Sequence, residues 1–397
     1  MSFYRQKIAK IFDVVSERSN RSLNMGLLGG KTGLSMALMV YSDIIRDEKI
    51  KSQGIEMLET VFKEIEQADS YIFSFSNGLS GFGWALEHLE QKGHISHNTN
   101  ALLEDFDSAL SDVLAFEMKK GNYDFLHGAL GIILYFISRM PKNENVLPVL
   151  QRFVVQLHEL AENLSTEWIN WVSVVDVEKR TKWVNISLSH GMSSLVVLLS
   201  KLYIIKGIDR EMVTTLLQRW VNFISMQEID KDRYGSFFSN YIIENQVSKS
   251  RLAWCYGDLG VSMALWQAGV ALHNETWKNK ALEVLLFAAE KRRDLNENFV
   301  IDAGLCHGAS GIGHIFYRMW WNTRMPEFKK AADYWFEKTL KMATHTDGLA
   351  GYKSWHGEER GWLNDCGLLE GIAGIGLALL TYYHEVEPKW DECLLLS

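Results

Sequence analysis

Proline and cysteine are scarce in this chain, and both absences restrict what it can be. Only 4 of the 397 residues are proline, and because proline breaks helix interiors, its scarcity favours a largely helical protein. The chain has 4 cysteines and no secretory signal, so a disulfide framework is a poor interpretation. Residues 1–20 have the spacing of an amphipathic helix, without the apolar core of a signal peptide. We therefore expect a helical, cytoplasmic protein.

Two further absences argue against whole classes of partner. The formal net charge is −8, and the longest basic cluster is Lys291-Arg292-Arg293. A nucleic-acid-binding protein normally has a basic stripe, so we predict no nucleic-acid partner. A membrane-spanning helix needs about 18 or more apolar residues in a row, whereas the longest uncharged stretch, residues 183–200, contains asparagine, histidine and several serines. No membrane span is expected.

A Gly-x-x-Gly motif followed by an apolar helical segment recurs along the chain in seven copies, the fourth of which has Ser194 in place of the second glycine. The first glycines of the copies are Gly30, Gly78, Gly128, Gly191, Gly257, Gly308 and Gly371. Second amphipathic segments lie between copies, for example over 55–68 and 215–224, and two helices per repeat are typical of an array of helical hairpins. The first and last repeats show no polar capping face, which favours a closed ring over an open solenoid. The sequence therefore predicts an all-α fold, a sevenfold α/α toroid that forms a single domain over 1–397.

The longer spacings contain inserts near 165–188 and 230–250. Residues 171–177 and 183–187 alternate in polarity as in a β-hairpin, and 234–247 is a second candidate. A glycine-rich segment over 348–361 precedes the seventh repeat. We expect small β-hairpin inserts on the rim of the toroid, beside the motif loops.

Aligning the seven copies on the first glycine concentrates potential metal ligands in two positions. The position before the glycine holds His127, His190 and His307, and the one before that holds Cys255 and Cys306. If the repeats are equivalent around a ring, these side chains point to one end of a central cavity. Two thiolates and an imidazole suit zinc, and three ligands leave a fourth position open, as in catalytic sites. We predict a Zn²⁺ site of Cys255, Cys306 and His307, against the alternative that the cysteines merely pack; His127 is interpreted as pocket lining.

Four further residues are candidates for acid–base and charge-stabilising roles. His190 is the candidate acid/base because imidazole titrates near neutral pH, and Asp124, four residues before Gly128, is a candidate for orienting or charging it. Arg251 and Tyr256 flank Cys255 and would supply a positive charge and a hydroxyl group. Plainer interpretations stay open: a core histidine, a solvated carboxylate, and an arginine that anchors its loop by capping carbonyl groups.

Three segments resemble signature motifs of the lanthionine synthetase C-like family, the lanthipeptide cyclases. They are Arg251-Leu-Ala-Trp-Cys-Tyr-Gly257, Leu305-Cys-His-Gly308 and Ser189-His-Gly191. The resemblance covers the whole chain, since that family has a sevenfold α/α toroid fold and all seven glycine motifs are present. It implies zinc on Cys255, Cys306 and His307, with His190 and Asp124 as acid/base residues and Arg251 and Tyr256 near the metal. Ser194 replaces the usual second glycine, so a small backbone change beside His190 is expected.

The resemblance also implies an activity and partners. The implied reaction adds peptide cysteine thiols to dehydroalanine or dehydrobutyrine and forms (methyl)lanthionine rings in a lanthipeptide precursor. The implied partners are the dehydrated precursor with its leader, a dehydratase and a membrane exporter, which would bring the protein to the inner face of the membrane. Two alternatives stay open: a non-catalytic member that binds zinc and a thiol or peptide, and an α/α-toroid glycosidase. A glycosidase needs paired carboxylates across a cleft, whereas the motif positions offer chiefly thiols and imidazoles.

Overall fold

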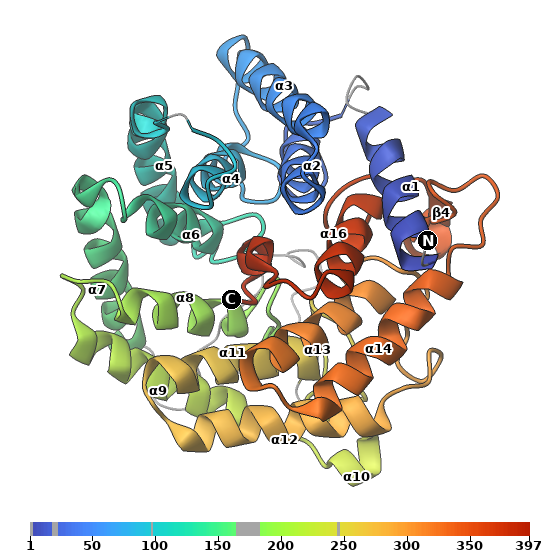
Figure 1. Cartoon of the computed structure of the whole chain (residues 1–397). Helices are drawn as coiled ribbons and strands as arrows, with labels where there is room; N and C mark the ends of the chain where they lie inside the picture. Colours follow the sequence, from blue (N-terminus) through green and yellow to red (C-terminus); the bar gives the residue numbers. More distant parts are fainter. Residues whose placement is uncertain (1–2, 18–22, 97, 164–182, 244–246) are drawn as a thin grey trace. The chain divides into compact units, whose positions relative to one another are not determined.

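The computed structural model describes residues 3–17, 23–96, 98–163, 183–243 and 247–397, and helices dominate these residues (Figure 1). The chain divides into two compact units. One is made of residues 1–98 and 289–396, and the other of residues 99–288 with residue 397. The strand predicted over 171–177 lies outside the described residues.

The first unit contains four of the seven repeats. Its helices are α1 (Phe3–Glu17), α2 (Lys31–Ile45), α3 (Glu48–Glu66), α4 (Leu79–Gln91), α13 (Ala309–Thr323), α14 (Pro326–Lys341), α15 (Gly357–Arg360), α16 (Ile372–Tyr383) and the 3₁₀ helix η3 (Lys389–Leu394). α2 packs with α3, α13 with α14, and α16 with α1 (Figure 1). The glycine-rich segment carries a two-stranded antiparallel sheet of β3 (Ser354–Trp355) and β4 (Trp362–Leu363).

The second unit contains the other three repeats. Its helices are α5 (Asn100–Lys120), α6 (Ala129–Arg139), the 3₁₀ helix η1 (Glu144–Val146), α7 (Leu147–Asn163), α8 (Met192–Tyr203), α9 (Arg210–Ser225), α10 (Lys231–Tyr234), α11 (Asp258–Ala271) and most of α12 (Glu275–Lys291). α8 packs with α9 and α11, and α6 with α5 and α7. β1 (Trp183–Val184) pairs in antiparallel fashion with β2 (Ile242–Ile243), so the two predicted inserts pair with one another.

The two helices of a repeat differ in burial as their sequence patterns predict. In α16, which follows a glycine motif, every residue from Ile372 to Thr381 is buried, as expected for a helix that is apolar all round. In α3, the second helix of its repeat, the buried residues are Gly54, Met57, Leu58, Val61 and Ile65. That spacing of three and four residues is one face of an amphipathic helix. The hairpin array is therefore confirmed.

The last repeat lies beside the first within the first unit. α16 packs against α2, and the Leu369 N–H donates to the Leu28 carbonyl at 2.9 Å. The amphipathic N-terminal helix is also confirmed, since α1 buries Ile8, Phe12 and Val15. Contact between the first and last repeats is what a closed array requires and an open solenoid lacks.

The second glycine of the motif allows each helix to begin directly over its own loop. A Cβ atom on Gly311 would lie 1.9 Å from the carbonyl oxygen of Leu305, a distance that no side chain tolerates. Ser194 departs from this pattern. It lies in the first turn of α8, where its hydroxyl donates to the Gly191 carbonyl at 2.6 Å. The Ser194 N–H also donates to the Gly191 carbonyl, at 3.2 Å, whereas the Gly311 N–H donates to Gly304, so the backbone hydrogen bonding of this repeat differs locally.

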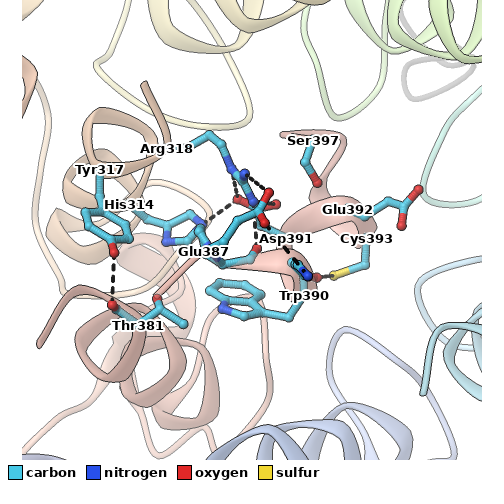
Figure 2. Close-up of polar contacts among 12 residues, drawn as sticks. His314, Tyr317, Arg318, Thr381, Glu387, Trp390, Asp391, Glu392, Cys393 and Ser397 are labelled. Carbon is cyan, nitrogen blue, oxygen red and sulfur yellow. Dashed lines mark hydrogen bonds and ion pairs between the residues drawn. The ribbon is translucent and has the colours of Figure 1, made fainter. Parts of the chain in front are cut away.

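A buried charge network fixes the C-terminal segment to α13 (Figure 2). The carboxylate of Asp391 in η3 accepts hydrogen bonds from Arg318 Nε and Nη2, at 2.8 and 2.7 Å, and from His314 Nε2 at 2.9 Å. Arg318 also donates to the Pro388 carbonyl at 2.8 Å. All three charged or titratable side chains are at most 2% exposed. The end of the chain is therefore part of the core of this unit.

Candidate active site

The motif loops of neighbouring repeats are joined by backbone hydrogen bonds. In the first unit these bonds run from the Leu305 N–H to Leu369, from the Leu369 N–H to Leu28 and from the Leu28 N–H to Ser76, each at 2.9 Å. In each acceptor loop the carbonyl belongs to the residue two before the first glycine. Equivalent loop positions are thereby held next to one another, as the alignment of the repeats predicts.

In the first unit, Cys306 and His307 bring two potential metal ligands together. They lie directly before α13, both only partly buried, and the Cys306 Sγ is within 4.8 Å of a ring nitrogen of His307. Two carboxylates lie close to the ring: Asp302 Oδ2 is 3.9 Å from Nε2, and Glu370 Oε2 is 3.8 Å from Nδ1. A thiolate and an imidazole are ligands that zinc accepts.

In the second unit, the Cys255 loop is joined to the His190 loop. The Cys255 carbonyl accepts from the Leu188 N–H at 3.2 Å and from the Ser189 hydroxyl at 3.3 Å. The residue is 3% exposed. These bonds use only the carbonyl oxygen, so the thiol takes no part in them.

His190 and Asp124 form a close pair. His190 Nδ1 lies 2.6 Å from Asp124 Oδ2, with the two side chains 19% and 10% exposed. The other oxygen of Asp124 accepts from the His127 N–H at 2.8 Å. Because an ionised carboxylate only accepts hydrogen bonds, the hydrogen of neutral His190 is on Nδ1. Nε2 is then the nitrogen that can exchange a proton.

Two aromatic rings surround His190. The His127 ring stacks on it with centroids 5.9 Å apart, and the Tyr256 ring lies 6.3 Å away. Burial lowers the pKa of His127, although Asp124 partly opposes this. The structure thus brings together Tyr256, Asp124 and His190 of the predicted set, together with the predicted pocket residue His127.

The backbone of Arg251 is fixed to the second insert. Its N–H donates to Asn240 Oδ1 at 3.1 Å, two residues before β2. The loop that follows is distinctive because Gly257 has φ +79°, whereas Gly191 at the same position of repeat four has φ −138°. The Cys255 loop therefore needs glycine for its backbone conformation.

The other two cysteines do not occupy the two motif positions that hold Cys255, Cys306 and His307. Cys366 is 5% exposed, and the buried Cys393 donates from Sγ to the Trp390 carbonyl at 3.2 Å. Burial raises the pKa of the Cys393 thiol well above its ordinary value. All four cysteines of the chain are thiols rather than disulfides.

Asp302 was not among the predicted site residues. A signal was present, because six residues before the first glycine the chain has asparagine in three repeats and aspartate in two.

Among the described residues, no helix combines the length and apolar composition that crossing a membrane requires.

Comparisons with known proteins identify relatives of this chain. The family model of the lanthionine synthetase C-like proteins matches residues 17–395. The nisin biosynthesis protein NisC of Lactococcus lactis subsp. lactis is 21% identical over 414 residues, which cover 98% of this chain and 94% of NisC. A solved structure of nisin cyclase superposes with a TM-score of 0.76 at 19% identity, covering 99% of this chain and 97% of that one.

The fold is therefore the predicted all-α fold of the α/α toroid class. The chain belongs to the lanthionine synthetase C-like family. Membership confirms the predicted class of enzyme, a lanthipeptide cyclase. The family binds a metal, and Cys306 with His307 is a possible Cys/His site for one.

Proposed function

We propose that this protein closes (methyl)lanthionine rings by adding cysteine thiols of a dehydrated precursor peptide to its dehydroalanine or dehydrobutyrine residues. The observation that carries the proposal is the His190–Asp124 pair, on a loop hydrogen-bonded to that of Cys255. Adding a thiol across a C=C double bond moves one proton from sulfur to carbon, so it needs a proton carrier beside a thiol site. The family membership and the likeness to nisin cyclase support the same reaction.

Cys255, Cys306 and His307 would hold a zinc ion. The donor chemistry fits: Cys306 and His307 offer a thiol and an imidazole within 4.8 Å of each other, and Cys255 is a thiol at the same repeat position as Cys306. Two thiolates and one imidazole suit Zn²⁺ and leave one position for a substrate. When bound, zinc would lower the pKa of a substrate thiol, which is ordinarily about 8.5, so that it reacts as a thiolate near neutral pH.

His190 would handle the proton. As the C–S bond forms at the β-carbon, the electron pair of the C=C bond moves onto the α-carbon and its carbonyl group. His190 Nε2 would take the proton that the substrate thiol loses and then deliver it to the α-carbon, while Asp124 accepts the hydrogen on Nδ1 and fixes the ring. The proton delivered is the one that the substrate thiol has lost, so His190 ends each cycle in its starting state. General acid–base catalysis of this kind contributes about 10²–10⁴-fold.

Arg251 and Tyr256 would act on the charge that develops during addition. The guanidinium is a cation, so Arg251 would stabilise the negative charge on the substrate carbonyl oxygen. Tyr256 is next to Cys255 in the chain, and its ring lies near that of His190. Its hydroxyl would donate a hydrogen bond to the same region.

The two inserts would form the docking surface for the precursor's leader. Their strands β1 and β2 pair, and the second insert anchors the Arg251 loop, so peptide binding there would be coupled to the site. In this proposal the toroid is one domain over 1–397 that works in the cytoplasm. A dehydratase would supply the dehydrated peptide, and an exporter at the inner face of the membrane would take the product.

Elemental analysis of purified protein tests the metal site. We expect about one zinc per chain in the wild type and none in Cys255→Ala. Cys393→Ala is the matched control, because it removes a cysteine that is buried outside the motif loops, and it should keep the metal. Retention of zinc by Cys255→Ala would contradict the site. Zinc binding without consumption of thiols in a dehydrated precursor would instead indicate a non-catalytic, thiol-binding member.

A further inference from the structure

His307 faces two carboxylates, and one of them is rigidly held. Asp302 has a side chain that is 1% exposed, whereas that of Glu370 is 25% exposed. Both oxygens of Asp302 are anchored: Oδ1 accepts from the Gly304 N–H at 3.0 Å and Oδ2 from the Trp355 N–H at 2.8 Å. The same Oδ2 lies 3.9 Å from His307 Nε2. Asp302 thus offers a fixed acceptor to a partly exposed imidazole ring.

The other repeats show which of these contacts the loop itself requires. Side chains at the same position, six before the first glycine, accept a hydrogen bond from the N–H two residues later in four other repeats: Asn24, Asn122, Asn185 and Asp365. Three of these four are asparagine, so the turn needs one side-chain oxygen and no charge. The loop geometry therefore accounts for Oδ1 of Asp302 alone, while Oδ2, which accepts from the Trp355 N–H, also faces His307.

We infer that Asp302 is a positioning residue for the ligand His307. With the metal bound, its Oδ2 would accept the hydrogen on Nε2, which fixes the tautomer and leaves Nδ1 for the metal; the inference rests on the zinc site of the proposed function. The separation of 3.9 Å exceeds a hydrogen bond, and a turn of the ring on metal binding closes it. Carboxylates that accept from a ligating imidazole orient it and raise its basicity, and losing them weakens metal binding about 10–100-fold.

β3 contributes to the position of Asp302. The Trp355 N–H donates to the oxygen that faces His307, so the glycine-rich segment before the seventh repeat holds Asp302 in place. One side-chain oxygen of Asp302 accepts the turn hydrogen bond and the other faces the ligand. Asparagine has only one acceptor oxygen, so it cannot accept in both places.

Asp302→Asn tests this in the full-length protein, with Asp365→Asn as the matched control. The control makes the same substitution at the same repeat position, in a loop without a ligand histidine. We would measure zinc affinity by competition with a chromophoric chelator, the d–d bands of the Co²⁺-substituted protein, and the Tm of the metal-free protein. Asp302→Asn should weaken zinc binding about 10–100-fold and shift the Co²⁺ bands, and Asp365→Asn should change neither.

Repeating Asp302→Asn in a His307→Cys variant distinguishes an effect on the His307 ring from an effect on the attachment of β3. In His307→Cys the ligand has no ring N–H, so adding Asp302→Asn should leave the remaining zinc affinity unchanged. An unchanged zinc affinity and Co²⁺ spectrum in Asp302→Asn, with a lowered Tm, would overturn the inference, because Asp302 would then serve only the loop.

A measurement on the wild type needs no substitution. Nitrogen-15 shifts of His307 in zinc-loaded, histidine-labelled protein should show the hydrogen on Nε2. A hydrogen on Nδ1 with Nε2 ligated would overturn the assignment while leaving the proposed zinc site intact. Failure of the wild type to bind zinc would overturn both, so the two failures are distinguishable.

Discussion

Removing the charge of Asp391 should destabilise the first unit strongly, because it leaves a buried guanidinium without its partner. Asp391 is 0% exposed, Arg318 is 2% exposed, and two hydrogen bonds join them (Figure 2). Removing one partner of a buried ion pair costs about 3–5 kcal/mol. Asp391→Asn keeps the size of the side chain but places an NH₂ group where His314 and Arg318 also donate.

The expected loss can be measured by thermal unfolding. An unfolding entropy of about 2.1 cal/mol/K per residue, taken over 397 residues, converts about 3–5 kcal/mol into a decrease of about 4–6 °C in Tm. Circular dichroism at pH 7 would follow it. Arg318→Met combined with Asp391→Leu should recover part of the loss, because no lone charge stays buried. A decrease below about 1 °C in Asp391→Asn would refute the reasoning.

The same network predicts how stability depends on pH. Burial alone would raise the pKa of Asp391, but Arg318 and His314 outweigh it and lower the pKa to about 2, against about 3.9 in an unfolded chain. This contribution, about 2–3 kcal/mol, is present above about pH 4 and is lost as the pH falls to about 2. Burial lowers the pKa of His314, so stability should begin to fall below about pH 6.5. Asp391→Asn should lose the dependence between pH 4 and 2; an identical profile in wild type and variant would contradict the assignment.

Three further predictions concern the site. Asp124→Ser should fold and bind zinc, because serine makes the same loop contact in repeat four at Ser187, but it should lower kcat at least about 100-fold; an unchanged kcat would remove Asp124 from the mechanism. Gly257→Ala should lower the free energy of unfolding by about 1–3 kcal/mol and weaken zinc binding, because alanine is strained at φ +79° and its Cβ would lie 2.5 Å from Ser250 Oγ. A Tm and a zinc content equal to those of the wild type would show that the loop adapts. Removing zinc with a chelator should abolish thiol consumption, and adding zinc should restore it, whereas a metal-independent enzyme would stay active.

Most of the fold could be predicted from the repeat pattern. Glycine spacing and apolar periodicity are local properties, so they located α2, α3 and α16 and the amphipathic α1. Pairing of β1 with β2 was not predictable, because it joins two inserts about 60 residues apart and each strand has only two residues. Alternating polarity identifies a strand but not its partner.

The repeat pattern predicted which residues occupy equivalent loop positions. It did not predict which groups their side chains contact. Aligning the loops placed His190 and Cys255 in equivalent positions, and the structure joins their loops through the backbone. Asp124 was proposed as the partner of His190 from its place four residues before Gly128, whereas its second contact, to the His127 N–H, came only from the structure. Asp302 was missed because the repeat pattern accounts only for the oxygen that accepts the turn hydrogen bond. The direction of its second oxygen depends on β3, which the pattern does not place.

The most direct test of the central claim is to count the thiols of a dehydrated lanthipeptide precursor, with its leader, before and after incubation with the zinc-loaded enzyme. Alkylation followed by mass spectrometry is required, since ring closure leaves the peptide mass unchanged. We expect wild type and Cys393→Ala to consume the thiols, and Cys255→Ala to leave them intact. Full thiol retention with the zinc-loaded wild type, or equal consumption by Cys255→Ala, would contradict it.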